Sequence, residues 1–330
     1  MRIRGLIQLL AGAILLALSL TSFSVRAQTS PAKGQTQVQE TDDEVKVNIY
    51  TKFANNYKTN RDVAYQAGKD YLQRYAKDND QYANYIREWI ALYEKEQRQR
   101  QLRDLVYSDR NFAEAFKLGK QVLAEEPDYL DALIALGNAG YLAAGARNEN
   151  FNAEAIGYAK KAIQFIEGGK SPDNWAPFKG KDDTLAYLYY TLALMNLKSA
   201  PNQAIAEVIK AVQFESELKK LPATYYFLAA AYETGPYKTL SADYQKNFAD
   251  KPETPEGKQA VEKLNQVIDR TIDAYARAVS AAGDDPKNAQ NKTTWLNRLT
   301  VLYKFRHGDS DAGLKELIAS ALSKPLPPTP

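Results

Sequence analysis

The 330-residue chain contains no cysteine and a single histidine, His307. These absences exclude disulfides, a Cys-His catalytic pair and the usual cysteine- and histidine-rich zinc sites. The glycines are scattered, and none belongs to a Gly-rich loop that could hold phosphate groups. His307 lies in residues 305–309, which we interpret as an exposed turn between two helices. We therefore predict no catalytic residue, no metal site and no cofactor, and we expect the protein not to be an enzyme.

The N-terminus has the pattern of a secretory signal peptide. A basic start at residues 1–4 precedes an apolar run at residues 6–20, and Ala27 supplies a small residue before Gln28. The run is shorter than the about 20 residues that a membrane span needs. We predict cleavage before Gln28 and an exported protein, periplasmic or extracellular, with no stable membrane span. An anchor that is kept uncleaved is the alternative.

No charge excess is left once this segment is removed. The chain has 43 Lys+Arg and 40 Asp+Glu, and three of the basic residues but no acidic ones lie in residues 1–27. The remainder therefore has 40 of each sign. Nucleic-acid binding needs a clustered excess of Lys and Arg, so we expect no nucleic-acid partner.

Residues 28–41 are rich in Gln, Thr, Ser, Pro and Gly and indicate a disordered tether. Helical spacing of apolar residues then begins near Asp42, with Asn60 expected to cap a second helix. A longer helix starts near Tyr82 and includes the polar stretch 94–101. We interpret this stretch as a solvated helix extension, with a charged docking surface as the alternative.

Small residues recur at steps of three and four in the middle of the chain, between residues 111 and 167. They allow neighbouring helices to approach closely, and such helix hairpins bury their apolar faces by stacking. The two sets are Ala115, Gly119 and Val122, and Ala155, Ala159 and Ala162. The pattern predicts an all-α solenoid.

These segments resemble the tetratricopeptide repeat (TPR) family. The first-helix positions are matched by Leu133, Leu136, Gly137 and Tyr141, the second-helix positions by the two small-residue sets and Pro127, and the last copy by Leu299, Tyr303, Ala312 and Ala319. Equivalent alanines fall at 64, 115, 155, 204, 274 and 312, at steps longer than the about 34 residues of the family. The resemblance implies a right-handed α-solenoid of about six expanded hairpins over residues 42–324, and a role in protein–protein interaction.

Two insertions and the C-terminus interrupt this pattern. Residues 167–183 include Trp175 and Phe178, and residues 234–258 include Tyr237. Turn residues mixed with aromatics predict ordered loops that pack on the solenoid, and these three aromatics are loop candidates for binding. The alternative is that Trp175 and Phe178 seal a hairpin edge. The proline-rich tail 325–330 is expected to be extended, and either frayed or a polyproline ligand.

Tyrosine is the most informative residue type, with 22 copies against 11 Phe and 3 Trp. It combines an apolar body with a polar tip, which suits recognition surfaces. The resemblance implies that the first helix of each repeat lines a concave groove. Its positions are Asp131, Ile134, Asn138, Tyr141 and Leu142, then Tyr187, Tyr190 and Leu194, then Tyr226 and Glu233. The alternative for each tyrosine is packing between repeats.

We therefore predict a scaffold of the bacterial cell envelope that holds a peptide or partner domain in a tyrosine-lined groove. The family's peptide-carboxylate clamp has a basic residue where this chain has Ile134, so we do not predict such a clamp. A homodimer is an open alternative, because imperfect end repeats can be hidden by self-association. A second alternative is an α/α toroid that cleaves or binds glycans, since such enzymes need only two carboxylates.

Overall fold

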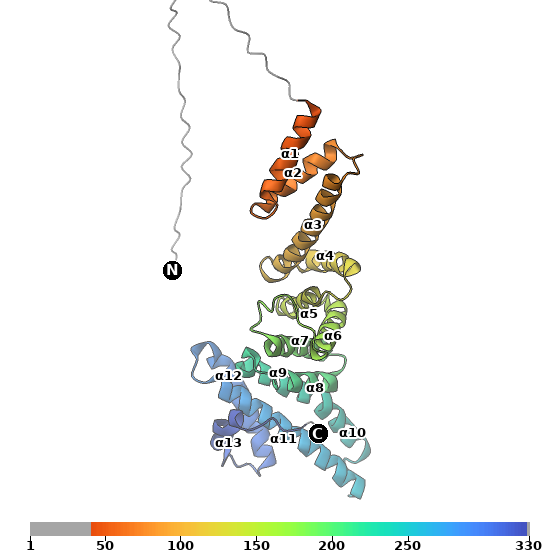
Figure 1. The fold of residues 1–330 in the computed structure, drawn as a ribbon. Coiled ribbons are helices and arrows are strands. Elements are labelled where there is room, and N and C mark those ends of the chain that lie inside the picture. The colour runs from red at the N-terminus through yellow and green to blue at the C-terminus, as the bar shows by residue number, and fades with distance from the viewer. Residues whose placement is uncertain (1–40, 329–330) are drawn as a thin grey trace, which may run out of the picture.

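The computed structural model describes residues 41–328, and within them the regular structure consists of helices alone (Figure 1). The predicted signal peptide and nearly all of the predicted tether lie outside the described residues. The helices are α1 Asp42–Asn56, α2 Arg61–Arg74, α3 Gln81–Tyr107, α4 Phe112–Glu125, α5 Leu130–Gly145, α6 Asn152–Glu167, α7 Lys181–Asn196, α8 Pro201–Ala211, α9 Pro222–Tyr232, α10 Lys238–Asn247, α11 Pro255–Ala282, α12 Ala289–Arg306 and α13 Leu314–Ser320. Short 3₁₀ turns occur at Glu217–Lys220, Pro286–Asn288 and Ala321–Ser323.

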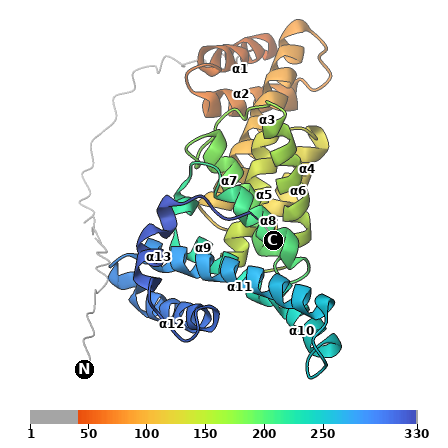
Figure 2. The same cartoon turned by 90° about the horizontal axis from the view of Figure 1, so that it is seen from below.

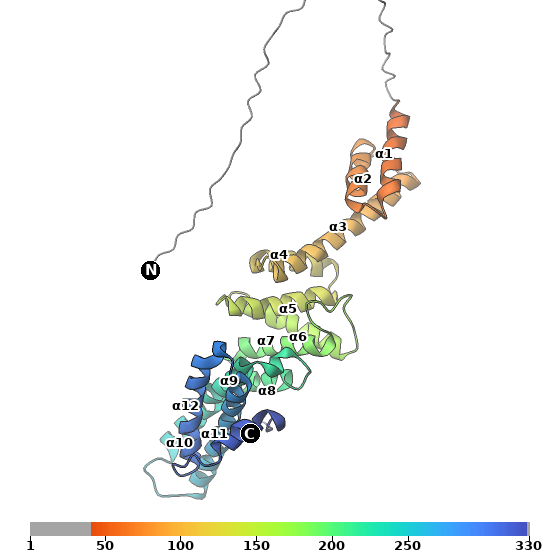
Figure 3. The ribbon, with the colours of Figure 1, turned by 90° about the vertical axis from the view of Figure 1, so that its left-hand side faces the viewer.

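The helices pack in chain order. α1 packs on α2, α3 on α4, α5 on α6 and α7 on α8, and each pair contacts the next. The result is the predicted all-α solenoid, and α1 lies at one end of it and α10, α11 and α12 at the other (Figures 1 and 3). The hairpins therefore do not close into a ring, and the toroid arrangement is wrong.

Side-chain caps place several helix starts. Thr41 and Glu44 form a capping box at the start of α1, where each side chain bonds the other residue's N–H. Asn60 accepts the Val63 N–H at the start of α2, which confirms the predicted cap. Polar side chains at these positions satisfy backbone N–H groups that have no partner inside the helix.

The small-residue sets lie at close helix contacts, as predicted. Ala155, Ala159 and Ala162 are fully buried on α6. A Cβ atom on Gly137 would lie 3.0 Å from the Ala159 Cα, and one on Gly140 would lie 2.5 Å from the Ala155 Cβ. Larger side chains on this stripe would push α5 and α6 apart.

The second insertion is largely helical, so the prediction of a loop over residues 234–258 is wrong. α9 continues through a π-helical turn, Glu233–Tyr237, into α10, and α11 begins at Pro255. The π turn accommodates Pro236, which has no N–H to donate. The close approach of Gly235 to the Pro201 ring adds a second constraint, since a Cβ there would lie 2.7 Å from the ring.

The C-terminal end also differs from the predicted last hairpin. α12 and α13 both pack on α11, and Ala312 and Ala319 are exposed. Ala312 lies in the turn before α13, where its carbonyl accepts the Tyr303 hydroxyl at 2.8 Å. α13 is too short to carry a stripe of small residues, so it covers the end of the solenoid instead of forming another repeat.

Two separate cores lie along the chain. We call α1, α2 and residues 81–93 of α3 the N-terminal module, whose core is built around Phe53, Tyr71 and Ile86. We call residues 102–328 the body, whose core consists of three clusters linked by partly buried side chains that they share. Along α3, no residue between Tyr93 and Leu102 is buried.

The polar stretch 94–101 of α3 joins the two cores, and it is half-buried up to residue 99. Its charges pair with neighbouring helices. Arg98 contacts Glu125 at 2.8 Å, Lys95 contacts Glu126, and Glu96 contacts Arg61 at 2.7 Å. The predicted solvated extension is therefore a charged joint between α2, α3 and α4.

Candidate functional site

Aromatic side chains from α5, α7 and α9 contact one another in the body, and we call Tyr141, Tyr187 and Tyr190 the tyrosine row. The Tyr141 ring of α5 lies edge-on to the rings of Tyr187 and Tyr190 on α7, at 5.6 and 6.1 Å between centroids. The Tyr190 ring then lies 5.6 Å from that of Phe227 on α9. The solenoid thus brings together residues from three successive first helices.

The members of the row differ in exposure. Tyr190 is buried, with 7% of its surface exposed, whereas Tyr141 and Tyr187 are half-buried. Leu142 and Leu194 beside them are also half-buried. Tyr190 therefore packs the repeats together, while the other four side chains keep surface that a partner could contact.

A second aromatic group lies further along the chain, between α9, α11 and α12. The Tyr226 ring of α9 stacks on Trp295 of α12 at 5.3 Å and lies 6.3 Å from the Tyr275 ring. Tyr226 is 41% exposed, so its outer ring face is open to solvent. Sequence reasoning missed Trp295, because α12 reaches α9 only through the long excursion of α10 and α11.

Burial raises the pKa of Tyr141, Tyr187 and Tyr190 above the ordinary tyrosine value, since an ionised phenolate is poorly solvated there. Their hydroxyl groups therefore stay protonated at neutral pH. A protonated phenol can donate a hydrogen bond to a carbonyl oxygen while its ring makes an apolar contact.

The N-terminal half of the predicted groove is covered by the chain itself. The Asp131 carboxylate accepts the N–H groups of Asp173 and Asn174 at 2.9 and 3.3 Å, and Arg103 donates to the Ala176 carbonyl at 3.3 Å. Loop 168–180 therefore lies against α5 at this point. Burial raises the pKa of Asp131, and its bonds from the loop backbone act in the opposite direction.

The packing of loop 168–180 against α5 also explains where two of the loop candidates lie. Phe178 is buried in the core beside Tyr187, 5.5 Å between rings, and Trp175 packs against that core. The interpretation that these two residues seal a hairpin edge agrees with this packing. Ile134 and Asn138 are buried beneath the same region of α5, with exposed fractions of 5% and 4%.

Two predicted residues hold the C-terminal helices in place. The Glu233 carboxylate accepts the Tyr275 hydroxyl at 3.1 Å and pairs with Arg298 at 2.6 Å. Tyr237 packs against the largest core cluster. Of the thirteen predicted residues, Tyr141, Leu142, Tyr187, Leu194 and Tyr226 thus combine a place on the first helices with surface free of these internal contacts.

In residues 41–328, no group of three or more His, Cys, Asp or Glu side chains is placed to hold a metal ion. No helix in this part of the chain is long and apolar enough to cross a membrane. Comparison with known proteins gave no match, either to a protein-family model or to a curated protein.

Proposed function

We propose that the protein is a non-enzymatic interaction scaffold of the TPR type that holds an extended segment of a partner protein along the open part of the tyrosine row and along Tyr226. The observation that carries the proposal is the partial exposure of Tyr141, Tyr187 and Tyr226 on successive first helices. Regular spacing of anchors on a rigid solenoid suits a partner that is itself extended.

Tyrosine is suited to this role for energetic reasons. It has few rotatable bonds, so it loses little entropy on binding, and large aromatic anchors carry much of the binding energy at interfaces. Each protonated hydroxyl can donate to a backbone carbonyl of the partner. Leu142 and Leu194 would add apolar contact between the aromatic anchors.

The cell envelope is the proposed location, because of the signal-peptide pattern before Gln28. Once residues 1–27 are removed, the predicted mature chain has no excess of charge and thus no long-range attraction for a polyanion. The partner would be selected by apolar and hydrogen-bonding contacts at the row.

A displayed peptide library selected on the purified protein would test the proposal. Binding of each selected peptide is then measured on Tyr141→Ala, Tyr187→Ala and Tyr226→Ala variants. We expect at least tenfold weaker binding for each variant, because loss of an aromatic anchor commonly costs about 2 kcal/mol or more. Tyr190 is left unchanged, since its truncation would open the core.

Tyr82→Ala is the matched control. The exposed fraction of Tyr82, 45%, is similar to the 41% of Tyr226, but Tyr82 lies on the N-terminal module. It should leave the affinity unchanged. Thermal unfolding of each variant confirms that the fold is kept. Peptides that bind the folded row variants as tightly as the parent would refute the proposal, and so would a library that yields no binder.

A further inference from the structure

The C-terminal tail returns to the body instead of leaving it. After α13 and the 3₁₀ turn Ala321–Ser323, residues 324–328 run back across the molecule toward α8 (Figure 2). They form one wall of a cavity of about 1050 Å³, whose other walls are the end of α8, the turn after it, α9 and α11. The expectation of a frayed end is wrong for this part of the tail.

The sequence itself makes this segment extended. Pro325, Pro327 and Pro328 have fixed φ angles, and Lys324 and Leu326 each precede a proline, which disfavours helix. Lys324 has φ −93° and ψ 148°, close to polyproline II. A segment of this kind loses little conformational entropy when it is held in a groove.

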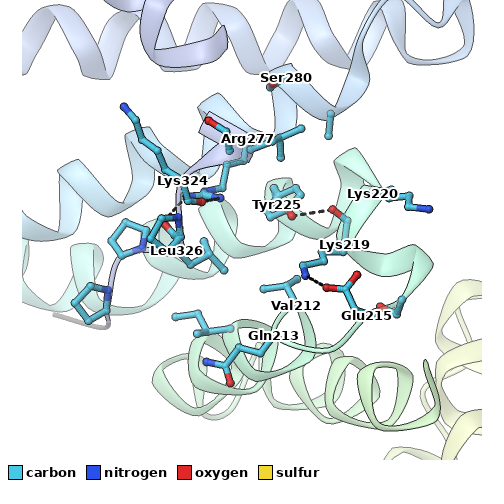
Figure 4. Close-up of a pocket in the computed structure, with 18 residues that line it drawn as sticks. Val212, Gln213, Glu215, Lys219, Lys220, Tyr225, Arg277, Ser280, Lys324 and Leu326 are labelled. Carbon is cyan, nitrogen blue, oxygen red and sulfur yellow. Dashed lines mark hydrogen bonds and ion pairs between the residues drawn. The ribbon is translucent and has the colours of Figure 1, made fainter. Parts of the chain in front are cut away.

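Arg277 on α11 forms hydrogen bonds with the main chain of the tail. Its guanidinium donates to the carbonyl oxygens of Lys324 at 3.0 Å and Pro325 at 2.8 Å (Figure 4). The side chain of Arg277 is only 4% exposed, and its Nε pairs with Asp273 at 2.7 Å. A buried cation fixed by its own carboxylate is thus aimed at two successive carbonyls, which any extended peptide could present.

Next to Arg277, the cavity wall contacts apolar side chains of the tail. Leu326 and Pro327 are half-buried, and Leu326 packs against the core cluster that includes Val212 and Tyr225. Figure 4 shows Leu326 beside Arg277, on the side of the cavity that faces Val212. This part of the cavity wall therefore accommodates a leucine that lies between two prolines.

The rim of the cavity carries several basic side chains. Lys219 pairs with Glu215, whereas Lys220 contacts Glu217 at 3.5 Å and Lys179 lies closer to the same carboxylate, at 2.6 Å. The contacts that the tail itself makes with the cavity walls are main-chain and apolar ones.

We propose that the surface of α8, α9 and α11 on which the tail lies, which we call the tail groove, is a binding site for extended proline-rich peptides of a partner protein, with the chain's own residues 324–328 as the internal competitor. The site is distinct from the tyrosine row. An attached tail acts at an effective concentration on the order of millimolar, so an outside peptide binds only when it outcompetes the tail or when the tail is released.

The test uses a fluorescently labelled peptide with the sequence of residues 323–330 and measures its anisotropy with two proteins. One is the full chain, and the other ends after Ser323. We expect the peptide to bind the shortened protein and to bind the full chain at least tenfold more weakly. An unrelated peptide that keeps the Pro-Leu-Pro-Pro order should behave in the same way. A peptide with alanine in place of Leu326 and of the prolines should not bind.

A second variant covers the case in which the shortened protein fails to fold. Leu326→Asp in the full chain weakens the contact between tail and body without removing the tail. We expect this variant to bind the free peptide at least tenfold more tightly than the unchanged full chain does. No binding to either folded variant overturns the proposal. Tail-dependent dimers seen by light scattering also overturn it, because the occupant would then be a second copy of the chain.

Discussion

The N-terminal module and the body pack their helices in different ways. In the module, the fully buried Phe53 ring lies within 6.3 Å of the rings of Tyr50, Tyr57, Tyr85 and Trp89. In the body, glycine on α5 and alanine on α6 allow close contacts between helices. Interlocked rings fill a wide space between helices, whereas small residues bring backbones together and leave no room for larger side chains.

The difference indicates that the two regions are separate packing units. They share α3, but the stretch between Tyr93 and Leu102 contributes ion pairs and no buried apolar residue. Partly exposed ion pairs contribute little to stability compared with an apolar core. The following predictions test whether each region depends on its own core.

The largest effect is expected for Phe53→Ala, which should destabilise the module by about 3–5 kcal/mol, because it removes the ring at the centre of the aromatic core. The three tryptophans report on the regions separately, since Trp89 lies in the module and Trp175 and Trp295 lie in the body. Denaturant unfolding of variants that keep only Trp89, or only Trp295, should show a shift in the module alone.

Val47→Ala is the control for this change, because Val47 lies on the same helix but is 62% exposed. It should alter the free energy of unfolding by less than about 0.5 kcal/mol. If Phe53→Ala moved the Trp295 transition as far as the Trp89 transition, the two regions would be one cooperative unit.

The next effect concerns the small-residue stripe of the body. Gly140→Leu should destabilise the body by about 1–3 kcal/mol or more, since the new side chain meets Ala155 and Met195 at once. Gly157→Ala on α6 is the matched change, because nothing lies within 4 Å of its Cβ position. It should stabilise the body by up to about 1 kcal/mol through helix propensity. Equal effects of the two changes, measured by thermal unfolding, would contradict the close-packing argument.

A smaller difference is expected in pH dependence. Burial raises the pKa of Glu207 in the body, although the Asn196 amide donates to it. In the module, the Ala83 N–H is the main group that lowers the pKa of Asp80. A carboxyl with a raised pKa binds its proton more readily in the folded state, so body stability falls as the pH rises above about 4.3. The stability that Asp80 provides is lost only below about pH 4.

Between pH 7 and pH 5, acidification should therefore raise the Trp295 unfolding midpoint and leave the Trp89 midpoint nearly unchanged. Glu207→Gln should weaken the pH dependence of the body, and the remainder is expected from Asp131, whose pKa burial also raises. A Trp295 midpoint that fell on acidification would have the wrong sign for this account.

The smallest effect is expected at the charged joint. Glu126→Gln removes the ion pair with Lys95 and should cost less than about 1 kcal/mol, because both side chains are about one-third exposed. Salt at 1 M should reduce the difference between variant and parent, since it screens exposed charges. A loss of several kcal/mol, or complete uncoupling of the two regions, would show that the joint carries more than a surface pair.

Much of the fold was predictable because it is encoded locally. The helical spacing, the Asn60 cap and the alanine stripe of α6 involve residues within a few positions of one another. The second insertion was misjudged because its Gly-Pro-Tyr sequence reads as a turn, yet a π turn lets the helix continue through Pro236. The first insertion was predicted correctly as a loop, but its hydrogen bonds to Asp131 were not predicted.

The sequence by itself determined most of the helices and their amphipathic faces, since these depend on propensity and on spacing along the chain. Only the tertiary structure decided which predicted groove residues stay open, because loop 168–180 and α3 cover some of them from a distance in sequence. It also decided that Arg277 meets the tail. Both contacts depend on how successive hairpins rotate as they stack, and that rotation is set by packing between helices that no local pattern encodes.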